Sequence, residues 1–156
     1  MFSIENLQAG LSTIFLGQKI KYHAKISSTN DNAWESIYKN EPEGTLIIAE
    51  DQVQGRGRHK NKWSSTQGKS LTFSFTLLPE MTFEKLCILP LLTGVSIVKG
   101  IYSITNILSG LKWPNDIMLN RKKMGGILIE SRTVEQGIIV VVGIGLNINE
   151  SEDDIP

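Results

Sequence analysis

The sequence predicts one α+β domain built on a mixed β-sheet, and three segments carry this prediction. Residues 70–78 alternate apolar and polar side chains, which is typical of a strand with one buried face. Residues 82–104 change to helical spacing. Residues 138–148 are almost continuously apolar, as a strand in the middle of a sheet is. With 156 residues and 40% apolar side chains, the chain can bury one core.

Composition and charge exclude several classes of protein. Sixteen basic and 16 acidic residues give a net charge of zero, whereas duplex-binding proteins usually carry a large positive surplus. Cys87 is the single cysteine, which excludes an internal disulfide and a zinc site built from cysteines. The N-terminus lacks a signal pattern, and we expect no apolar run long enough to span a membrane. These features predict a cytoplasmic protein.

The first part of the chain should form two strands and a helix. Residues 20–26 fit a strand, and residues 45–49 form a short run with β-strand propensity. Between them, Ser28, Thr29 and Asn30 precede apolar residues at helical spacing. Their side chains fit two interpretations: capping of a helix start, or binding of a polar ligand head by the hydroxyl groups and the free amide hydrogens of that start.

The most unusual segment runs from Gln52 to Trp63 and joins two expected strands. Gly55 and Gly57 allow the backbone to come close to a ligand. Arg56 and Arg58 supply planar, permanently charged groups that suit a phosphate or a carboxylate. One interpretation is a loop that folds over an anionic ligand. The alternatives are a solvated basic turn or a nucleic-acid contact, because segments rich in arginine and glycine are common in RNA-binding proteins.

The strand and the helix that follow this loop should supply core scaffold. In the strand over residues 70–78, one face is apolar and comprises Leu71, Phe73, Phe75 and Leu77, whereas the other face is polar and comprises Thr72, Ser74 and Thr76. The alternation therefore predicts a half-buried strand. In the helix, the predicted core stripe consists of Leu91, Val95, Val98 and Tyr102. Pro90 makes the start of this helix uncertain.

A hairpin with an unusual turn is expected at residues 110–119. One strand ends near Trp113, the chain turns through Pro-Asn-Asp, and a second strand follows that pairs with the first. Lys112, Trp113, Asn115 and Asp116 place a cation, an aromatic plane, an amide and a carboxylate within a few residues of one another. Turn chemistry alone would explain these residues. The mixture can also hold a nucleotide or a metal-bound phosphate.

Lys123 begins the next apolar strand and lies just before the glycine pair Gly125 and Gly126. A lysine at such a place is usually a solvated turn residue, but it can also point at a ligand while the glycines let the backbone pass beneath it. The strand over residues 138–148 contains further glycines and is followed by acidic residues. We expect this strand to be central in the sheet.

Several reaction classes do not fit the residues present. The chain has two histidines, His23 and His59, and no serine elbow, so a hydrolytic triad is disfavoured. No Walker A sequence and no glycine fingerprint of a dinucleotide fold occurs. Glycine loops beside lysine and arginine remain. Such a site stabilises charge, as phosphoryl or nucleotidyl transfer to a carboxylate requires.

Five blocks, in this order and at this spacing, resemble the catalytic core of biotin protein ligase. The resemblance covers residues 20–149. The blocks are Ser28-Thr29-Asn30, Ala49-Glu50-Asp51-Gln52 with Gly55-Arg56-Gly57-Arg58 and Trp63, Lys112-Trp113-Pro114-Asn115-Asp116, Lys123-Met124-Gly125-Gly126-Ile127-Leu128, and Gly143-Ile144-Gly145-Leu146-Asn147. The resemblance implies an α+β fold like that of class II aminoacyl-tRNA synthetases, a mixed sheet with helices packed on one side.

The resemblance also implies an activity. Members of that family activate biotin with ATP and Mg²⁺ to biotinyl-5′-AMP, and then transfer biotin to one lysine of a biotin carrier domain, such as that of acetyl-CoA carboxylase. We therefore expect a biotin–[acetyl-CoA-carboxylase] ligase. Two alternatives are a non-catalytic biotin-binding module and a relative of the lipoate and octanoyl transferases.

The residues that match the family's blocks are expected to form the site. The implied catalytic residues are Lys123, Arg56 and Arg58. The implied biotin-binding residues are Ser28, Thr29, Asn30, Gln52, Gly55, Arg56, Gly57, Arg58, Lys123, Gly125 and Gly126. The implied nucleotide-binding residues are Trp63, Lys112, Asn115, Asp116 and Asn147. The resemblance assigns no residue as a metal ligand.

Two departures from the family bear on domain organisation. Some relatives carry an N-terminal helix-turn-helix that binds DNA, and the residues before Ser28 leave no room for one. Family members usually continue beyond Asn147 into further catalytic structure and a small SH3-like barrel. We therefore expect residues 1–156 to form a single catalytic domain that lacks its C-terminal end, with no DNA or membrane partner. The family often dimerises, so a homodimer is one expected assembly.

Overall fold

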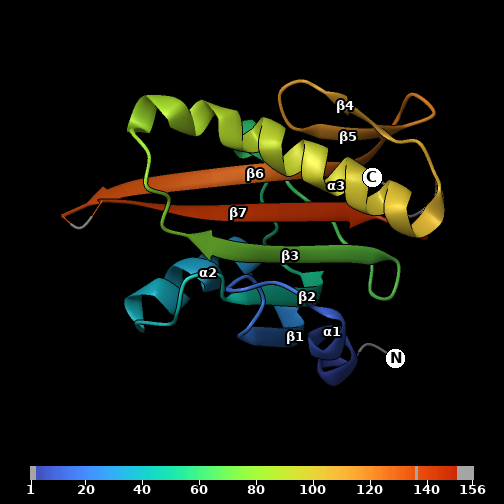
Figure 1. Cartoon of the computed structure of the whole chain (residues 1–156). Helices are drawn as coiled ribbons and strands as arrows, with labels where there is room; N and C mark the ends of the chain where they lie inside the picture. Colours follow the sequence, from blue (N-terminus) through green and yellow to red (C-terminus); the bar gives the residue numbers. More distant parts are fainter. Residues whose placement is uncertain (1–2, 136, 151–156) are drawn as a thin grey trace.

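Seven strands form one sheet in the computed structural model, which describes residues 3–135 and 137–150 (Figure 1). The strands are β1 (Ile20–Ile26), β2 (Leu46–Gln52), β3 (Ser70–Leu77), β4 (Gly110–Lys112), β5 (Asp116–Leu119), β6 (Lys122–Val134) and β7 (Gly137–Asn147). Their order across the sheet is β1-β2-β3-β7-β6-β5-β4. The first pair, β1 and β2, is parallel, and every other neighbouring pair is antiparallel. The predicted mixed sheet is confirmed.

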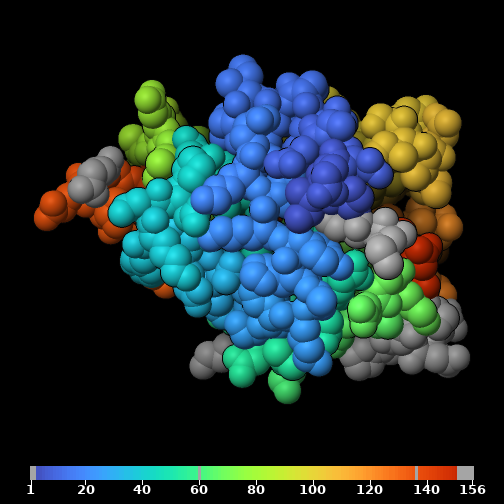
Figure 2. All heavy atoms as spheres, turned by 90° about the horizontal axis from the view of Figure 1, so that it is seen from below, coloured from blue at the N-terminus to red at the C-terminus, as the bar shows by residue number. Residues whose placement is uncertain are grey.

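The helices lie on both faces of this sheet. They are α1 (Ile4–Gly10), α2 (Thr29–Tyr38) and α3 (Leu89–Thr105), with short 3₁₀ segments η1 (Arg58–Lys60) and η2 (Phe83–Ile88). Successive side chains of a strand point to opposite faces. Val141 packs with α2, whereas Val140 and Val142 belong to the core under α3, so these two helices cover opposite faces. The expectation that the helices pack on one side is therefore wrong, because α2 and α3 cover different faces. Seen from below, the N-terminal segments form the visible face (Figure 2).

Strand β7 is central, as predicted. It lies between β3 and β6, and Val140, Val141 and Val142 are fully buried. Both of its faces are covered because each contributes to a separate cluster of buried side chains. This explains why the sequence of the strand is almost continuously apolar. The predicted strand at residues 20–26 and the hairpin at residues 110–119 are also confirmed.

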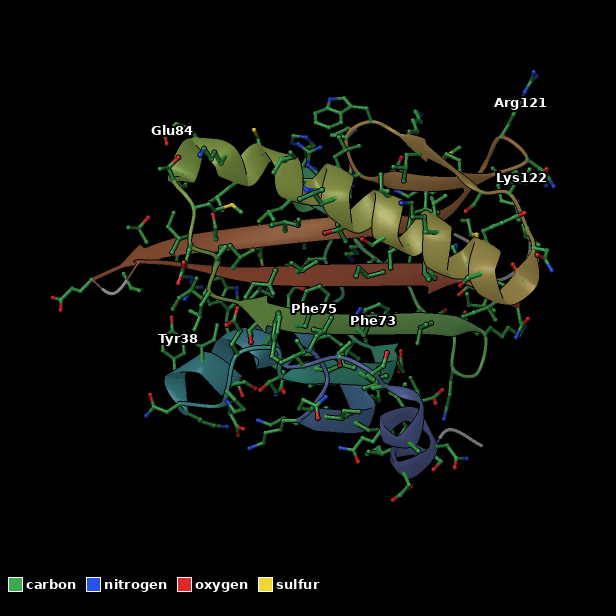
Figure 3. All side chains as sticks on the ribbon, in the orientation of Figure 1. Tyr38, Phe73, Phe75, Glu84, Arg121 and Lys122 are labelled. Atoms are coloured by element: carbon green, nitrogen blue, oxygen red, sulfur yellow. The ribbon has the colours of Figure 1, made fainter. Side chains whose placement is uncertain are left out.

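Strand β3 has the predicted alternation but not the predicted burial. Its polar residues are the buried ones: Thr72, Ser74 and Thr76 are at most 3% exposed. Phe73 and Phe75 pack against the core on the α3 side, where they remain partly exposed (Figure 3). The polar face is covered because it meets the start of α2, where the Ser74 hydroxyl lies within hydrogen-bond distance of Thr29 and Asn30. The prediction of a strand with only one covered face is therefore wrong, because both faces of β3 are covered.

Helix α3 begins at Leu89, with Pro90 in its first turn, where proline is tolerated. Its buried residues are Leu89 and Gly94, and Ile97 and Ile101 pack partly against the same core. The predicted stripe was wrong, because three of its members are among the exposed large apolar side chains: Leu91, Val95 and Tyr102. The helix is apolar on two faces, so spacing alone does not reveal which face meets the sheet.

One segment passes a length and composition test for a membrane span. Among the described residues, the segment Phe83–Thr105 contains an 18-residue stretch with a mean hydropathy of 1.7, so the expectation that no apolar run reaches the required length is wrong. Such a single segment is weak evidence for a span, because core helices of other proteins pass the same test. Here the segment changes from 3₁₀ to α-helix at Leu89 and contributes Leu86, Leu89 and Gly94 to the packing on the sheet.

Candidate ligand-binding and active site

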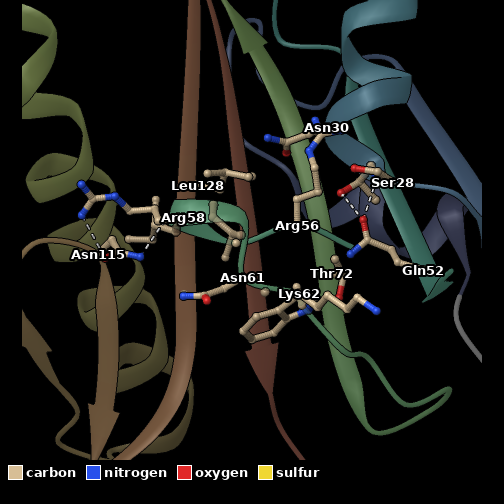
Figure 4. Close-up of a pocket in the computed structure, with 18 of the residues that line it drawn as sticks. Ser28, Asn30, Gln52, Arg56, Arg58, Asn61, Lys62, Thr72, Asn115 and Leu128 are labelled. Atoms are coloured by element: carbon tan, nitrogen blue, oxygen red, sulfur yellow. Dashed lines mark hydrogen bonds between the residues drawn. The ribbon is translucent and has the colours of Figure 1, made fainter. Parts of the chain in front are cut away.

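A pocket of about 220 Å³ lies on the face of the sheet that α2 covers. The loop between β2 and β3 closes one side of it, and the β4–β5 turn closes another (Figure 4). Most of the predicted site residues lie together here, although they come from four separate parts of the chain. The predicted residues that line the pocket are Ser28, Thr29, Asn30, Gln52, Arg56, Gly57, Arg58, Trp63, Asn115, Asp116, Lys123 and Gly126.

The floor of the pocket consists of glycines on β6 and β7. A Cβ atom on Gly143 would lie 2.1 Å from Asn30 Oδ1, and one on Gly145 would lie 2.3 Å from the Trp63 indole. A Cβ on Gly126 would lie 3.6 Å from both the Lys123 stem and the same indole. Any side chain at Gly143 or Gly145 would therefore displace a residue that lines the pocket. The glycines let Asn30 and Trp63 lie directly on the sheet.

One end of the pocket is polar and closely hydrogen-bonded. Ser28 caps α2, because its Oγ accepts a hydrogen bond from the Asp31 backbone at 3.4 Å. Gln52 Oε1 accepts from the Thr29 backbone N–H at 2.7 Å and from its hydroxyl at 3.1 Å. Ser74 Oγ lies 2.6 Å from Asn30 Oδ1. Both interpretations of the Ser-Thr-Asn run are compatible with this arrangement, because Ser28 caps the helix and also lines the pocket.

The loop from Val53 to Trp63 folds back on itself. The Trp63 N–H donates to the Gly55 carbonyl at 2.9 Å, and the Gly57 N–H donates to the Asn61 carbonyl at 2.8 Å. His59 has a positive φ of 54°, which reverses the chain at the tip. These two hydrogen bonds hold the two arms of the loop together. Arg56, Arg58 and Lys62 therefore line the pocket, although their side chains remain exposed to solvent.

The two loop arginines have different partners. Arg56 pairs with Asp31 at 2.5 Å and with Glu130 at 3.2 Å. Burial, the largest single effect, lowers the pKa of Arg56, but the hydrogen bond to Asp31 and the charges of Glu130 and Asp31 together outweigh it and raise this pKa. Arg58 donates to the neutral Asn115 Oδ1 at 3.3 Å (Figure 4). Of the two guanidinium groups, that of Arg58 is therefore better placed to meet an anion in the pocket.

Lys123 lies at the opposite wall and pairs with Asp116, with 2.8 Å between Nζ and Oδ1. The β4–β5 turn holds Asp116 in place, since Asn115 Nδ2 donates to the Ile127 carbonyl at 3.2 Å and the Ile127 N–H donates to the Asn115 carbonyl at 2.9 Å. The Lys123 side chain is about half exposed, at 49%. An anion in the pocket can therefore reach it without moving the backbone.

Four of the predicted residues do not line this pocket. Gly125 points to the other face of the sheet, where a Cβ would lie 2.6 Å from Leu146 Cδ2, so it serves packing under α3 and not the floor. Gly55 is buried behind the loop, where a Cβ would lie 2.4 Å from the Trp63 carbonyl. Lys112 is exposed beside the β4–β5 turn. Asn147 lies beyond Gly145 on β7, with a buried Oδ1 that has no hydrogen-bond partner among the described residues.

Several pocket residues were not predicted. Thr72, Gly143 and Gly145 line the floor, and Lys62 adds a further cation. The polar alternation of β3 and the glycines of β7 were visible signals for the first three. Glu130, which lies behind the pocket and does not line it, gave no local signal. Its partner Asn30 is 100 positions away in the chain, so only the folded sheet brings the two together.

Comparison with known proteins identifies relatives of this chain. A sequence model of the biotin/lipoate A/B protein ligase family matches residues 22–149. The bifunctional ligase/repressor BirA of Bacillus spizizenii is 41% identical over 155 residues, which are 99% of this chain and 48% of the relative. The biotin–[acetyl-CoA-carboxylase] ligase of Mycobacterium tuberculosis is 32% identical over 117 residues, or 72% of this chain and 42% of the relative. The chain spans about half the length of these relatives.

Solved structures resemble the fold. A biotin protein ligase from Aquifex aeolicus, in complex with biotin and ATP, superposes with a TM-score of 0.73 at 37% identity, covering 89% of this chain and 55% of that one. A biotin protein ligase from Leishmania major, in complex with biotinyl-5-AMP, gives a TM-score of 0.72 at 27% identity, covering 86% and 59%. The predicted fold class is confirmed.

Proposed function

Because this chain belongs to the biotin/lipoate A/B protein ligase family, we propose that it activates biotin with ATP and transfers the biotinyl group to a lysine of a carrier domain. The relatives with the highest identities above are ligases, and an Aquifex aeolicus relative binds biotin and ATP. The proposed acceptor is the carrier domain of an acetyl-CoA carboxylase, as in the name of the Mycobacterium tuberculosis relative. The proposed location is the cytoplasm.

One observation carries the proposal: a single pocket joins a polar end to a cationic end. Ser28, Thr29 and Gln52 present hydroxyl and amide groups at the first end, and Arg58 and Lys123 present charges at the second. Biotin has a ureido group at one end and a carboxylate at the other. The ureido ring would hydrogen-bond with the polar end, and the carboxylate would point toward the cations.

The first step joins two anions that repel one another. A carboxylate oxygen of biotin attacks the α-phosphorus of ATP, the bond to pyrophosphate breaks, and biotinyl-5′-AMP forms. Arg58 and Lys123 would hold both anions within reach and stabilise the charge that develops on the α-phosphate. Asp116 would orient the Lys123 ammonium through their 2.8 Å contact. Trp63, Asn115 and Asn147 are proposed to lie near the nucleotide.

A magnesium ion fits this site only as a companion of the nucleotide. The described residues contain no group of three or more histidine, cysteine, aspartate or glutamate side chains that could hold a metal. Mg²⁺ commonly binds through substrate phosphates plus one or two carboxylates, and Asp116 is the carboxylate that lines the pocket. When bound, the ion would neutralise phosphate charge.

The second step releases AMP. The ε-amino nitrogen of the acceptor lysine attacks the carbonyl carbon of the mixed anhydride, an amide forms, and the bond to AMP breaks. The carrier must present a deprotonated lysine at the open side of the pocket. The loop around Arg56 and Arg58 would cover the adenylate until then, because water would hydrolyse the anhydride.

The test is the intact mass of a purified biotin carrier domain after incubation with this chain, biotin, ATP and Mg²⁺. We expect one biotinyl addition that depends on ATP. A carrier of unchanged mass, with biotin still bound according to calorimetry, would contradict the ligase proposal and favour a binding module. Lipoate offered in place of biotin should give no addition.

A further inference from the structure

Glu130 lies behind the pocket, where it touches the loop and helix α2 but does not line the pocket itself. We propose that Glu130 is a positioning residue that fixes the loop from Val53 to Trp63 over the site by holding Arg56. The kinetic part of this proposal rests on the proposed ligase function. The structural part, the ordering of the loop, does not.

Three donors, two from helix α2 and one from the loop, meet at the Glu130 carboxylate. Asn30 Nδ2 donates to Oε2 at 2.9 Å, and Trp34 Nε1 donates to the same oxygen at 3.3 Å. Arg56 Nη2 lies 3.2 Å from Oε1 and 3.3 Å from Oε2. Strand β6 alternates, so Glu130 points to the same face as Gly126 and Leu128, which line the pocket. One carboxylate thus joins the helix start, the helix body and the loop.

The partners of Arg56 explain why this contact should order the loop. Two carboxylates, those of Asp31 and Glu130, hold its guanidinium, and Figure 4 shows its side chain reaching toward Asn30 at the start of α2. The internal bonds of the loop shape it, but they do not attach it to the sheet. From within the loop, Arg56 provides an attachment to α2 and β6, and Arg58 provides one to the β4–β5 turn through Asn115. Charge-assisted pairs with partial burial are stronger than exposed ones.

The same contact also fixes a predicted biotin-binding residue. Asn30 Nδ2 donates to Glu130, while Asn30 Oδ1 lies 2.6 Å from Ser74 Oγ. A glutamine at position 130 would keep the size of the side chain but would replace one acceptor oxygen by an NH₂ group. That group cannot accept from Asn30, Trp34 or Arg56. With the remaining oxygen in the Oε2 position, Asn30 and Trp34 would keep their acceptor, but Arg56 would lose one of its two contacts and would face an NH₂ group. The carboxylate charge that holds Arg56 would be halved.

The first experiment measures loop order in the ligand-free protein by ¹⁵N relaxation. In the wild type, we expect backbone order parameters at residues 56–61 to approach the rigid value of roughly 0.85. In Glu130→Gln they should fall below roughly 0.6, and they should fall similarly in Arg56→Ala. The matched control is Glu35→Gln, which removes the same charge from an exposed part of α2 and should leave the loop unchanged. An unchanged loop in Glu130→Gln would overturn the proposal whatever the protein's function is.

The second experiment is a double-mutant cycle on the rate of adenylate formation. Glu130→Gln should slow this rate about tenfold in the wild-type background and less than about twofold in the Arg56→Ala background, because the interaction it removes is then already absent. The slowing should appear in kcat more than in the KM for biotin. Equal slowing in both backgrounds would show that Glu130 does not act through Arg56, and would overturn the proposal.

The two experiments separate this inference from the proposed function. If the wild type forms no adenylate while its loop loosens in Glu130→Gln, the ligase proposal fails and the positioning role is supported. The unfolding temperature of each variant is measured as well. A fall in the unfolding temperature that accounts for the lost rate, with an ordered loop, would assign Glu130 a purely structural role and overturn the proposal.

Discussion

Single residues around the pocket differ in whether their charge is already paired. Arg56 faces two carboxylates, Lys123 faces one, and Arg58 faces a neutral amide. A cation that is already neutralised attracts an incoming anion less than one that is not. This ordering suggests that Arg58 and Lys123 meet the reacting anions, while Arg56 fixes the loop. Both arginines lie in one sequence motif, so their different roles could not be predicted from the sequence.

Removing the Lys123 charge should slow adenylate formation severely. We expect Lys123→Ala to lower the rate by roughly 100-fold or more, because this group would stabilise charge that develops in the transition state. Pyrophosphate release reports the step. Arg121→Ala is the matched control: it removes one charge at the β5–β6 turn, outside the pocket (Figure 3), and should change the rate little. Near-normal pyrophosphate release by Lys123→Ala would refute this role.

Adding one methyl group to the pocket floor should weaken biotin binding. The Cβ of Gly143→Ala would lie 2.1 Å from Asn30 Oδ1, and Asn30 cannot move freely because Ser74 and Glu130 both hold it. We expect a loss of about 1–3 kcal/mol in the free energy of unfolding and a rise of roughly tenfold or more in the Kd for biotin, measured by calorimetry.

A second glycine provides the control for this substitution. In Gly100→Ala, the new Cβ in helix α3 would have nothing within 4 Å. This variant should bind biotin normally and gain about 0.5–1 kcal/mol of stability, because alanine favours a helix interior. If Gly143→Ala also bound biotin normally, Asn30 would not position the ligand.

Among the secondary-structure elements, the loop from Val53 to Trp63 should respond most to ligands. Few backbone hydrogen bonds tie it to the rest of the chain, and its basic side chains face the pocket. We expect biotin plus ATP to slow amide hydrogen exchange at residues 54–62, because bound anions would hold Arg58 and Lys62. Exchange in the buried strand β7 should stay constant and serves as the internal reference. Equal exchange with and without ligands would contradict this added protection of the loop by bound anions.

The contact between the α2–β2 connection and the start of β1 should depend on pH. Glu41 bonds to Lys19 and Lys21, and these hydrogen bonds lower the pKa of its carboxyl below the ordinary value. A lowered folded-state pKa stabilises the protein above the unfolded value of about 4.3, and this stability is lost as the pH falls through the folded value. Wild type should therefore exceed Glu41→Gln in urea stability at pH 7.

This advantage should shrink as the pH falls below about 4.3. The control is Glu80→Gln, which changes an exposed glutamate on another connection and should show no such difference. A constant gap between wild type and Glu41→Gln at every pH would mean that the lysine pairs do not stabilise the fold through charge.

Sequence patterns predicted where the helices and strands lie in the chain better than which of their faces are buried. The strand at residues 20–26 was predicted to the residue, because its β-branched and aromatic side chains end at a run of capping residues. The burial of β3 was not predictable, because the hydroxyl groups of Thr72 and Ser74 are buried only where α2 and the pocket meet them. Pocket residues carried by motifs could be predicted, whereas Glu130 could not, because its partners are distant in sequence.

Across the whole molecule, helix α3 leaves an apolar surface exposed. One face of the helix packs on the sheet through Leu89 and Gly94. The opposite face is also apolar and is 38–51% exposed at its large side chains, which are Ile88, Leu91, Leu92, Val95 and Tyr102. A helix that is apolar all round is normally buried, and a contiguous exposed apolar patch marks an interaction surface or an aggregation risk. This face should therefore bind hydrophobic probes.

The double variant Leu92→Gln and Val95→Gln tests this property. We expect it to lower the fluorescence of a bound hydrophobic dye by roughly half or more, because it places two polar groups in the centre of the patch. Unfolding temperature should change little, since both side chains lie on the outer face. Ile14→Gln is the control, because Ile14 is 96% exposed and far from α3 in the chain, so its loss should leave dye binding unchanged. Equal dye fluorescence in the double variant and the wild type would show that the outer face of α3 is not the site that binds the dye.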